Sequence, residues 1–192
     1  VWQCVGRLHV PIVAIQVGLL VHKINFLRRY STAFLLRRMQ SMLFGESELD
    51  PMCQTFPGIR EHVHVNQFGV DTSFWTPGSA TESGYVLAVG NDGRRDYSTL
   101  LVAAKNLPYK VLLLTAQTLP LPLPPNVEHI HGHYAEGVSD AQLRDLYRGA
   151  VCVVVPLKPT LQPSGQSVTL QAMACGRPVV LTKTQGIWSH DT

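Results

Sequence analysis

Charged residues are scarce in this 192-residue chain: they make up 15% of it, against 45% hydrophobic residues. Disordered chains combine high charge with few apolar residues, so this composition excludes disorder. It also excludes fibrous repeats and coiled coils, whose compositions are strongly biased. Long apolar runs are missing as well, because the longest candidate, 10–21, is interrupted by Pro11 and Gln16. A bilayer span needs about 20 apolar residues. The chain is therefore expected to fold around a globular core.

Cysteine is also rare, and the four cysteines form no C-x-x-C pair. Cys152 and Cys175 fall within apolar runs, where buried reduced thiols are common. This usage indicates a reducing compartment and predicts a cytoplasmic protein. The chain contains no Asp-x-Asp sequence, so a diphosphate bridged by a metal ion has no support.

The net charge of +3 gives no indication of nucleic-acid binding, but the cations are clustered. Residues 23–38 carry five of them with no acid before Glu46: Lys23, Arg28, Arg29, Arg37 and Arg38. One interpretation is a solvated helix face. The other is a basic amphipathic helix that contacts phospholipid headgroups, as in a peripheral membrane protein on the inner face of a membrane.

The first 84 residues have an irregular pattern. A β-branched segment at 10–15 predicts a strand, apolar residues at near-helical spacing across 25–44 predict a helix, and 62–65 alternate like a short strand. Residues 68–84 are rich in glycine, proline and serine, which is typical of a linker.

From Tyr85 the pattern becomes regular. Strands are predicted at 85–89, 109–115, 127–131, 151–155 and 178–182, and those at 85–89, 109–115 and 151–155 are apolar runs. Between them, helices are predicted after the N-caps Asp96 and Ser139 and over 165–175. Strands that alternate with amphipathic helices predict an α/β fold with a parallel sheet.

Two strand ends carry residues suited to a ligand, which in open parallel sheets binds at the carboxyl ends of strands. Residues 89–96 combine two glycines, which allow close backbone approach, with two arginines whose forked donors suit phosphate. Residues 162–167 form a small-residue turn that opens a helix, where unpaired N–H groups and the helix dipole favour an anion. The alternatives are an ordinary glycine-rich turn and a plain N-cap by Ser164.

Residues 163–180, Pro-Ser-Gly-Gln-Ser-Val-Thr-Leu-Gln-Ala-Met-Ala-Cys-Gly-Arg-Pro-Val-Val, resemble the donor-site signature of GT-B glycosyltransferases of the family-4-like retaining group. Three further stretches, within 68–77, 89–101 and 143–156, agree with that family in order and spacing. The resemblance implies a Rossmann-like parallel sheet. It also implies three parts: the end of an acceptor-side N-terminal domain (1–67), an interdomain linker (68–84) and a truncated donor-binding domain (85–192).

The resemblance further implies roles for single residues. Arg95 takes the position of the basic residue that neutralises the leaving diphosphate, which makes it the catalytic candidate. Gln171 takes the second position of the family's E-x7-E pair, where the acid holds the ribose. The other donor-binding candidates lie at the strand end and in the loop before the last helix: Gly90, Arg94, Ser164, Gly165 and Gln166.

Departures from the family pattern bear on activity. Pro163 and Gln171 occupy both positions of the acid pair, so neither carboxylate is present. Gln171 can still donate to and accept from a ribose diol, whereas Pro163 cannot contact a donor sugar as an acid does. Either Ser164 and Gln166 hold the sugar, or the donor differs, or this copy is inactive. Asn91 also replaces the arginine usual at that position.

His129, His131 and His133 alternate along a strand end and raise the question of a metal site. We favour a strand end at the rim of the nucleotide cleft instead, because no carboxylate or cysteine partner is evident. The family resemblance implies that this strand end lies near the base, with His131 and Tyr134 as base-proximal candidates. A dinucleotide site is disfavoured because the G-x-G-x-x-G spacing is missing. Neither a metal nor another cofactor is expected.

The resemblance thus implies a glycosyltransferase that moves a sugar from a nucleotide-diphosphate sugar to a saccharide or lipid-linked acceptor, with retention and without metal, in cell-envelope polysaccharide synthesis. Two alternatives stay open: a non-catalytic homologue that binds nucleotide sugars, and a nucleotide-sugar epimerase of the same fold, which needs acids in the cleft. Because the chain starts at Val1 and stops soon after its fifth strand, we also expect a fragment that is inactive alone.

Overall fold

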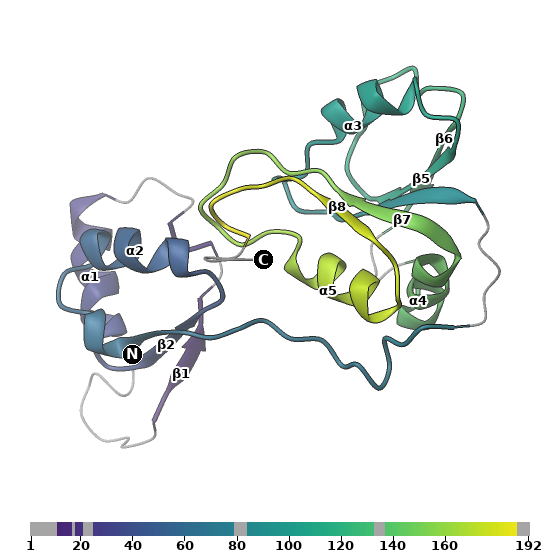
Figure 1. Cartoon of the computed structure of the whole chain (residues 1–192). Helices are drawn as coiled ribbons and strands as arrows, with labels where there is room; N and C mark the ends of the chain where they lie inside the picture. Colours follow the sequence, from purple (N-terminus) through teal and green to yellow (C-terminus); the bar gives the residue numbers. More distant parts are fainter. Residues whose placement is uncertain (1–10, 17, 21–24, 79–83, 133–136, 188–192) are drawn as a thin grey trace. The chain divides into compact units, whose positions relative to one another are not determined.

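The computed structural model describes residues 11–16, 18–20, 25–78, 84–132 and 137–187 (Figure 1). The chain divides into two compact units. The first comprises residues 1–68 with the short segments 161–163 and 185–192, and the second comprises 69–160 and 164–184. Each unit has its own parallel sheet.

The first unit is built on a three-stranded parallel sheet of order β1-β2-β3. Its strands are β1 (Val13–Ile15), β2 (Gln40–Leu43) and β3 (Val63–Val65). Its helices are α1 (Phe26–Leu36) and α2 (Leu49–Thr55), with the 3-10 turns η1 (Glu46–Glu48) and η2 (Arg60–His62). Its core consists of seven buried side chains: Ala33, Leu36, Leu43, Met52, Phe56, Ile59 and Val63.

The helix predicted across 25–44 is wrong in its second half. Helix α1 begins after Asn25, whose side chain accepts a hydrogen bond from the Arg28 N–H, and ends at Leu36. The chain then turns into β2, which lies between β1 and β3. The apolar residues Met39 and Leu43 are four positions apart, a spacing that keeps side chains on one face in a helix and in a strand alike. Sheet pairing decides between the two.

The second unit has a five-stranded parallel sheet of order β6-β5-β4-β7-β8. Its strands are β4 (Tyr85–Val89), β5 (Lys110–Thr115), β6 (Val127–His131), β7 (Ala150–Val155) and β8 (Val179–Leu181). Its helices are α3 (Tyr97–Ala104), α4 (Asp140–Gly149) and α5 (Gln166–Ala174). The parallel α/β fold predicted from the sequence is confirmed. The strand order reverses between β4 and β7, which is the point where ligands bind in open α/β sheets.

The sheet of the second unit is covered on both faces (Figure 1). Ala88 of β4 and Leu113 of β5 pack against α3, which Asp96 caps by accepting from the Thr99 N–H. Helices α4 and α5 contact strands β4, β7 and β8 and lie on the opposite side from α3. Strands covered on both faces need apolar residues throughout, and every residue of β4 is buried.

Residues 74–76, within the expected linker, pack against α4. The Arg148 Nε donates to the Thr76 carbonyl over 2.9 Å, and the Arg144 Nη1 donates to the Phe74 carbonyl over 3.4 Å. Trp75 is buried and its ring meets Tyr147 edge-on, with ring centroids 5.8 Å apart. This end of the segment is therefore part of the second unit.

None of the described helices combines the length and the hydrophobicity that crossing a membrane requires.

Candidate functional site

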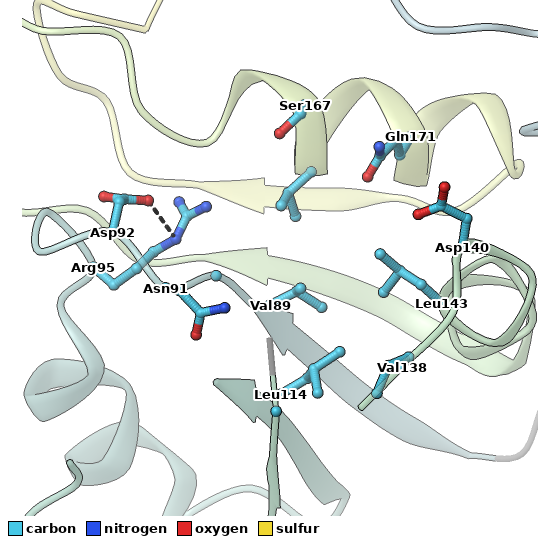
Figure 2. A pocket seen from close by; sticks show the side chains of 13 residues that line it. Val89, Asn91, Asp92, Arg95, Leu114, Val138, Asp140, Leu143, Ser167 and Gln171 are labelled. Atoms are coloured by element: carbon cyan, nitrogen blue, oxygen red, sulfur yellow. Dashed lines mark ion pairs between the residues drawn. The ribbon is translucent and has the colours of Figure 1, made fainter. Parts of the chain in front are cut away.

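A pocket of about 460 Å³ opens at the carboxyl edge of the second unit's sheet (Figure 2). The strand ends contribute Val89 and Gly90 of β4, Leu114 of β5 and Gly132 after β6. The loop after β4 contributes Asn91, Asp92 and Arg95. The start of α4 contributes Val138, Asp140 and Leu143, and α5 contributes Ser167, Val168 and Gln171. Both stretches selected from the sequence thus reach one pocket.

Three of the candidate residues line this pocket: Gly90, Arg95 and Gln171. The other described candidates lie outside its lining: Arg94, Ser164, Gly165, Gln166 and His131. Tyr134 lies outside the described residues. The pocket therefore brings together Arg95, the catalytic candidate for the diphosphate, and Gln171, the candidate for the ribose, while the base-proximal prediction stays untested.

Arg95 is the most buried charged group of the site, with a side chain only 3% exposed. Its Nε lies 3.3 Å from Asp92 Oδ2 in an ion pair (Figure 2). Within the described part of the chain, neither Nε nor Nη1 makes a hydrogen bond. A buried guanidinium with unused donors has a strong electrostatic reason to bind an anion.

Two glycines make room for the Arg95 guanidinium. Gly90 has a φ of +146°, and a Cβ there would lie 2.6 Å from Arg95 Nη2. Gly165 has a φ of +82°, and a Cβ there would lie 2.9 Å from Arg95 Nη1 and 2.6 Å from Val155 Cγ1. Larger residues would be strained at both positions and would displace the guanidinium.

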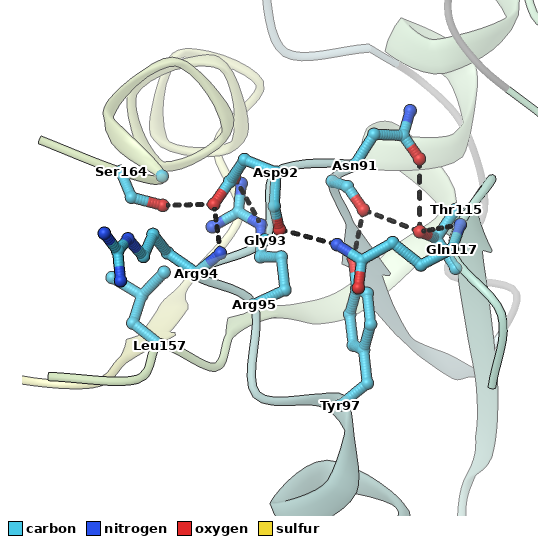
Figure 3. A network of polar contacts seen from close by, with 12 residues as sticks. Asn91, Asp92, Gly93, Arg94, Arg95, Tyr97, Thr115, Gln117, Leu157 and Ser164 are labelled. Atoms are coloured by element: carbon cyan, nitrogen blue, oxygen red, sulfur yellow. Dashed lines mark hydrogen bonds and ion pairs between the residues drawn. The ribbon is translucent and has the colours of Figure 1, made fainter. Parts of the chain in front are cut away.

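Helix α5 begins at Gln166, and its N-cap residue is Gly165, so no side chain caps this helix. The alternative of an N-cap by Ser164 is therefore wrong: the Ser164 hydroxyl donates instead to Asp92 Oδ1 over 2.9 Å (Figure 3). The same oxygen accepts from the Arg94 N–H over 3.0 Å. Asp92 thus links the loop after β4 to the start of α5. The arrangement brings Arg95 to a helix N-terminus, where the dipole favours negative charge.

Hydrogen bonds fix the end of β4 (Figure 3). The Gly90 carbonyl accepts from the Tyr97 hydroxyl over 2.5 Å and from the Thr115 hydroxyl over 2.8 Å. Burial raises the pKa of Tyr97 to about 12, so at neutral pH this phenol remains protonated and can donate. Asn91 Oδ1 accepts from the Ala116 N–H over 2.5 Å. The residue that replaces the family's arginine therefore ties the loops after β4 and β5 together.

A hydrogen bond from the neighbouring helix α4 orients the side chain of Gln171. The Tyr147 hydroxyl of α4 donates to Gln171 Oε1 over 3.1 Å. Tyr147 is fully buried, and this burial raises the pKa of its phenol above the ordinary value. The amide of Gln171 is therefore held at the pocket wall by a neutral hydroxyl.

The histidines at the end of β6 show no ligand geometry in the described region. The His129 Nε2 lies 2.9 Å from the Thr115 carbonyl oxygen, and the rings of His129 and His131 are 5.7 Å apart. His133 lies outside the described residues. Among the residues that are described, no three histidine, cysteine or acidic side chains form a group that could hold a metal ion.

Two acids of the pocket were not selected from the sequence. Asp92 lies within a stretch chosen for its glycines and arginines, and no local pattern shows that it pairs with Arg95. Asp140 follows the N-cap Ser139 directly, where an acid is ordinarily explained by the helix dipole. Only the folded chain shows that both carboxylates line the pocket.

The chain belongs to the family of glycosyl transferases group 1, whose model matches residues 94–191, just over half of its length. No curated protein matches the chain. Among solved structures, it is similar to a sucrose-phosphate synthase from Thermosynechococcus elongatus, with TM-score 0.69 and 16% identity over 95% of this chain and 53% of that chain. It is similar to Anabaena HepE in complex with UDP-glucose, with TM-score 0.69 and 15% identity over 93% of this chain and 58% of that one.

A third similar structure is WaaG, a glycosyltransferase involved in lipopolysaccharide biosynthesis, with TM-score 0.62 and 15% identity over 88% of this chain and 55% of that one. The fold is therefore the Rossmann-like parallel sheet of GT-B glycosyltransferases. The chain spans a little over half the length of these three structures.

Proposed function

We propose that the pocket of the second unit binds the nucleoside diphosphate of a nucleotide sugar, and that the whole protein transfers the sugar to a saccharide or lipid-linked acceptor. The observation that carries this proposal is the buried Arg95 guanidinium at the start of α5, with Nη1 unpaired among the described residues. Cleavage of a sugar–phosphate bond leaves negative charge on the diphosphate. A fixed cation and helix N-terminal amides stabilise that charge without reorganising.

We propose transfer with retention and without a metal ion. In this reaction the acceptor oxygen bonds to the anomeric carbon as the bond to phosphate breaks, and the acceptor's proton passes to the departing phosphate oxygen. Arg95 then supplies the positive charge that a metal supplies in other transferases. The absence of an Asp-x-Asp sequence supports this division of roles.

We also propose the division into parts that the sequence predicts: residues 1–67 as the end of an acceptor-side domain, 68–84 as an interdomain linker and 85–192 as the truncated donor domain. The donor and acceptor are chosen for testing by analogy. The similar structure HepE is in complex with UDP-glucose, and the similar structure WaaG is a glycosyltransferase involved in lipopolysaccharide biosynthesis. UDP-glucose is therefore the first donor to test, with envelope saccharides as first acceptors.

Radiolabelled nucleotide sugars offered to the full-length protein test this function. Transfer of label to an acceptor, in the presence of a metal chelator and with the donor's anomeric configuration kept in the product, is expected. Binding of a nucleotide sugar without turnover would favour the non-catalytic homologue, which Pro163 and Gln171 at the acid positions support. Conversion of the nucleotide sugar into its epimer without an acceptor would favour the epimerase.

We propose that α1 makes a peripheral contact with a membrane's cytoplasmic face. Phe26 and Leu27 are 75% and 77% exposed on this helix, beside Arg28. Arg29 and Arg37 are engaged elsewhere in the first unit, since they donate to carbonyl groups at the end of α2 and at Pro57. The basic stretch therefore has fewer cations for lipid than the sequence indicates, and its apolar side chains carry more of the contact.

Co-sedimentation with lipid vesicles tests this contact. The full-length protein is expected to bind vesicles that contain anionic lipid, and Phe26→Ser with Leu27→Ser is expected to release it. Equal behaviour of the two proteins would show that this face of α1 does not contact lipid.

A further inference from the structure

The pocket has two ends with different chemistry. Arg95 and Asp92 lie at one end in Figure 2, and Gln171 and Asp140 lie toward the other. The first end suits a diphosphate. The second end has no cation among the residues that line the pocket, so it suits the neutral part of a nucleotide.

Gln171 presents two N–H donors and only a neutral, partly used acceptor to this end. Its Oε1 accepts from the Tyr147 hydroxyl over 3.1 Å, which leaves the two N–H groups of Nε2 for a ligand. The related enzymes have a carboxylate here by family resemblance, and a carboxylate accepts hydrogen bonds from both hydroxyls of a ribose. The amide oxygen is uncharged and already accepts one hydrogen bond, so it is a weaker acceptor for the ribose hydroxyls than a carboxylate is.

Asp140 can supply the charged acceptor that position 171 lacks. It is the first residue of α4 and lies three positions before Leu143 and seven before Tyr147. Positions i, i+3 and i+7 share one face of a helix. Leu143 lines the pocket and Tyr147 contacts Gln171, so this face of α4 is the one turned to the pocket. Within the described part of the chain, the Asp140 carboxylate has neither a hydrogen bond nor an ion pair.

We propose that Asp140 and Gln171 together bind the ribose diol of the nucleotide, with Asp140 accepting from a hydroxyl and Gln171 donating to a hydroxyl oxygen. The acid that the chain lacks at position 171 is thus supplied by α4. Tyr147 is a positioning residue in this arrangement, because it fixes which side of the amide faces the ligand. The assignment rests on the proposed nucleotide function.

The negative charge of Asp140 makes the proposal testable, because its removal should change the affinities for two kinds of ligand differently. A carboxylate at the pocket wall repels a diphosphate, so its removal alone should strengthen the binding of any anion. If Asp140 binds the ribose, its removal weakens only ligands that carry the hydroxyls. Asp140→Asn should therefore weaken the binding of UDP while leaving the binding of 2′,3′-dideoxy-UDP unchanged or tighter.

Calorimetry on the full-length protein tests this directly, with ADP and GDP replacing UDP if they bind more tightly. The unaltered protein is expected to prefer the ribonucleotide. Asp140→Asn should weaken the binding of the ribonucleotide about 10- to 100-fold, as expected for a lost charge-assisted hydrogen bond. It should leave the affinity for the dideoxynucleotide unchanged or raise it. The matched control is Asp145→Asn, which removes the same charge from the same helix at a position outside the pocket lining.

A rescue completes the experiment. Gln171→Glu in the Asp140→Asn background should restore the preference for the ribonucleotide, because it returns an acceptor to the same end of the pocket. Equal losses for both ligands, or an unchanged preference in Asp140→Asn, would overturn the assignment while leaving the nucleotide function standing. Failure of every nucleoside diphosphate to bind the unaltered protein would overturn both.

Discussion

Gly90→Ala is the sharpest perturbation of the site. The φ of +146° at Gly90 is strained for alanine by about 1–3 kcal/mol. The added Cβ would also lie 2.6 Å from Arg95 Nη2 and 2.7 Å from Cζ. The guanidinium cannot move away freely, because it is almost fully buried and Gly165 lies against Nη1. Forcing an extra carbon into such a space costs about 1–3 kcal/mol more.

A double-mutant cycle with Arg95→Ala separates the two costs. Without the guanidinium the clash disappears and only the backbone strain remains, so Gly90→Ala should cost about 1–3 kcal/mol less in the Arg95→Ala background. Urea unfolding, followed by tryptophan fluorescence, measures the four free energies of unfolding. Gly93→Ala is the matched control, since its Cβ would meet no atom within 4 Å, and it should change stability by less than about 0.5 kcal/mol. Additive costs in the cycle, within about 0.5 kcal/mol, would refute the placement of Arg95 against Gly90.

Two further predictions concern stability, one for each unit. Burial raises the pKa of Glu48 from 4.5 to about 7, so the folded first unit favours the protonated acid. The free energy of unfolding should therefore fall by about 1–3 kcal/mol as pH rises from about 4.5 to above about 7. Glu48→Gln should remove this fall and the exposed Glu61→Gln should not; the same pH slope in wild type and Glu48→Gln would contradict the cause. In the second unit, Ser139→Ala removes the hydroxyl that accepts from the Gln142 N–H in the capping box and should cost about 1 kcal/mol by thermal unfolding, whereas Ser98→Ala, at an exposed position of α3, should cost almost nothing. Equal effects of these two serines would argue against the cap.

The second unit follows from its sequence almost completely, because its elements are separated by clear breaks. Asp96 and Ser139 cap their helices as predicted, and strands β4, β7 and β8 are continuous apolar runs. The first unit follows less well. The spacing of Met39 and Leu43 fits both a helix and a strand, and only the pairing of β2 with β1 and β3 decides the outcome.

In the site, too, the sequence identifies which residues are candidates, whereas their contacts depend on residues far away in the chain. Gly90 and Gly165 stand out in the sequence as glycines beside a ligand, but in the structure both make room for the Arg95 guanidinium. Ser164 is selected as a loop residue, yet its hydroxyl binds Asp92, which is 72 positions away. Asp140 reaches the pocket only because α4 packs beside α5. Contacts of this kind depend on topology and leave no periodic signal.

The affinity of the full-length protein for UDP, measured by calorimetry with and without Arg95→Ala, tests the central claim most directly. Loss of the buried guanidinium removes at least one charge-assisted hydrogen bond to the diphosphate, so binding should weaken about 10- to 100-fold. Arg94→Ala is the control, because Arg94 does not line the pocket, and it should bind UDP as wild type does. Equal affinities of wild type and Arg95→Ala would contradict the claim that this pocket holds the diphosphate through Arg95.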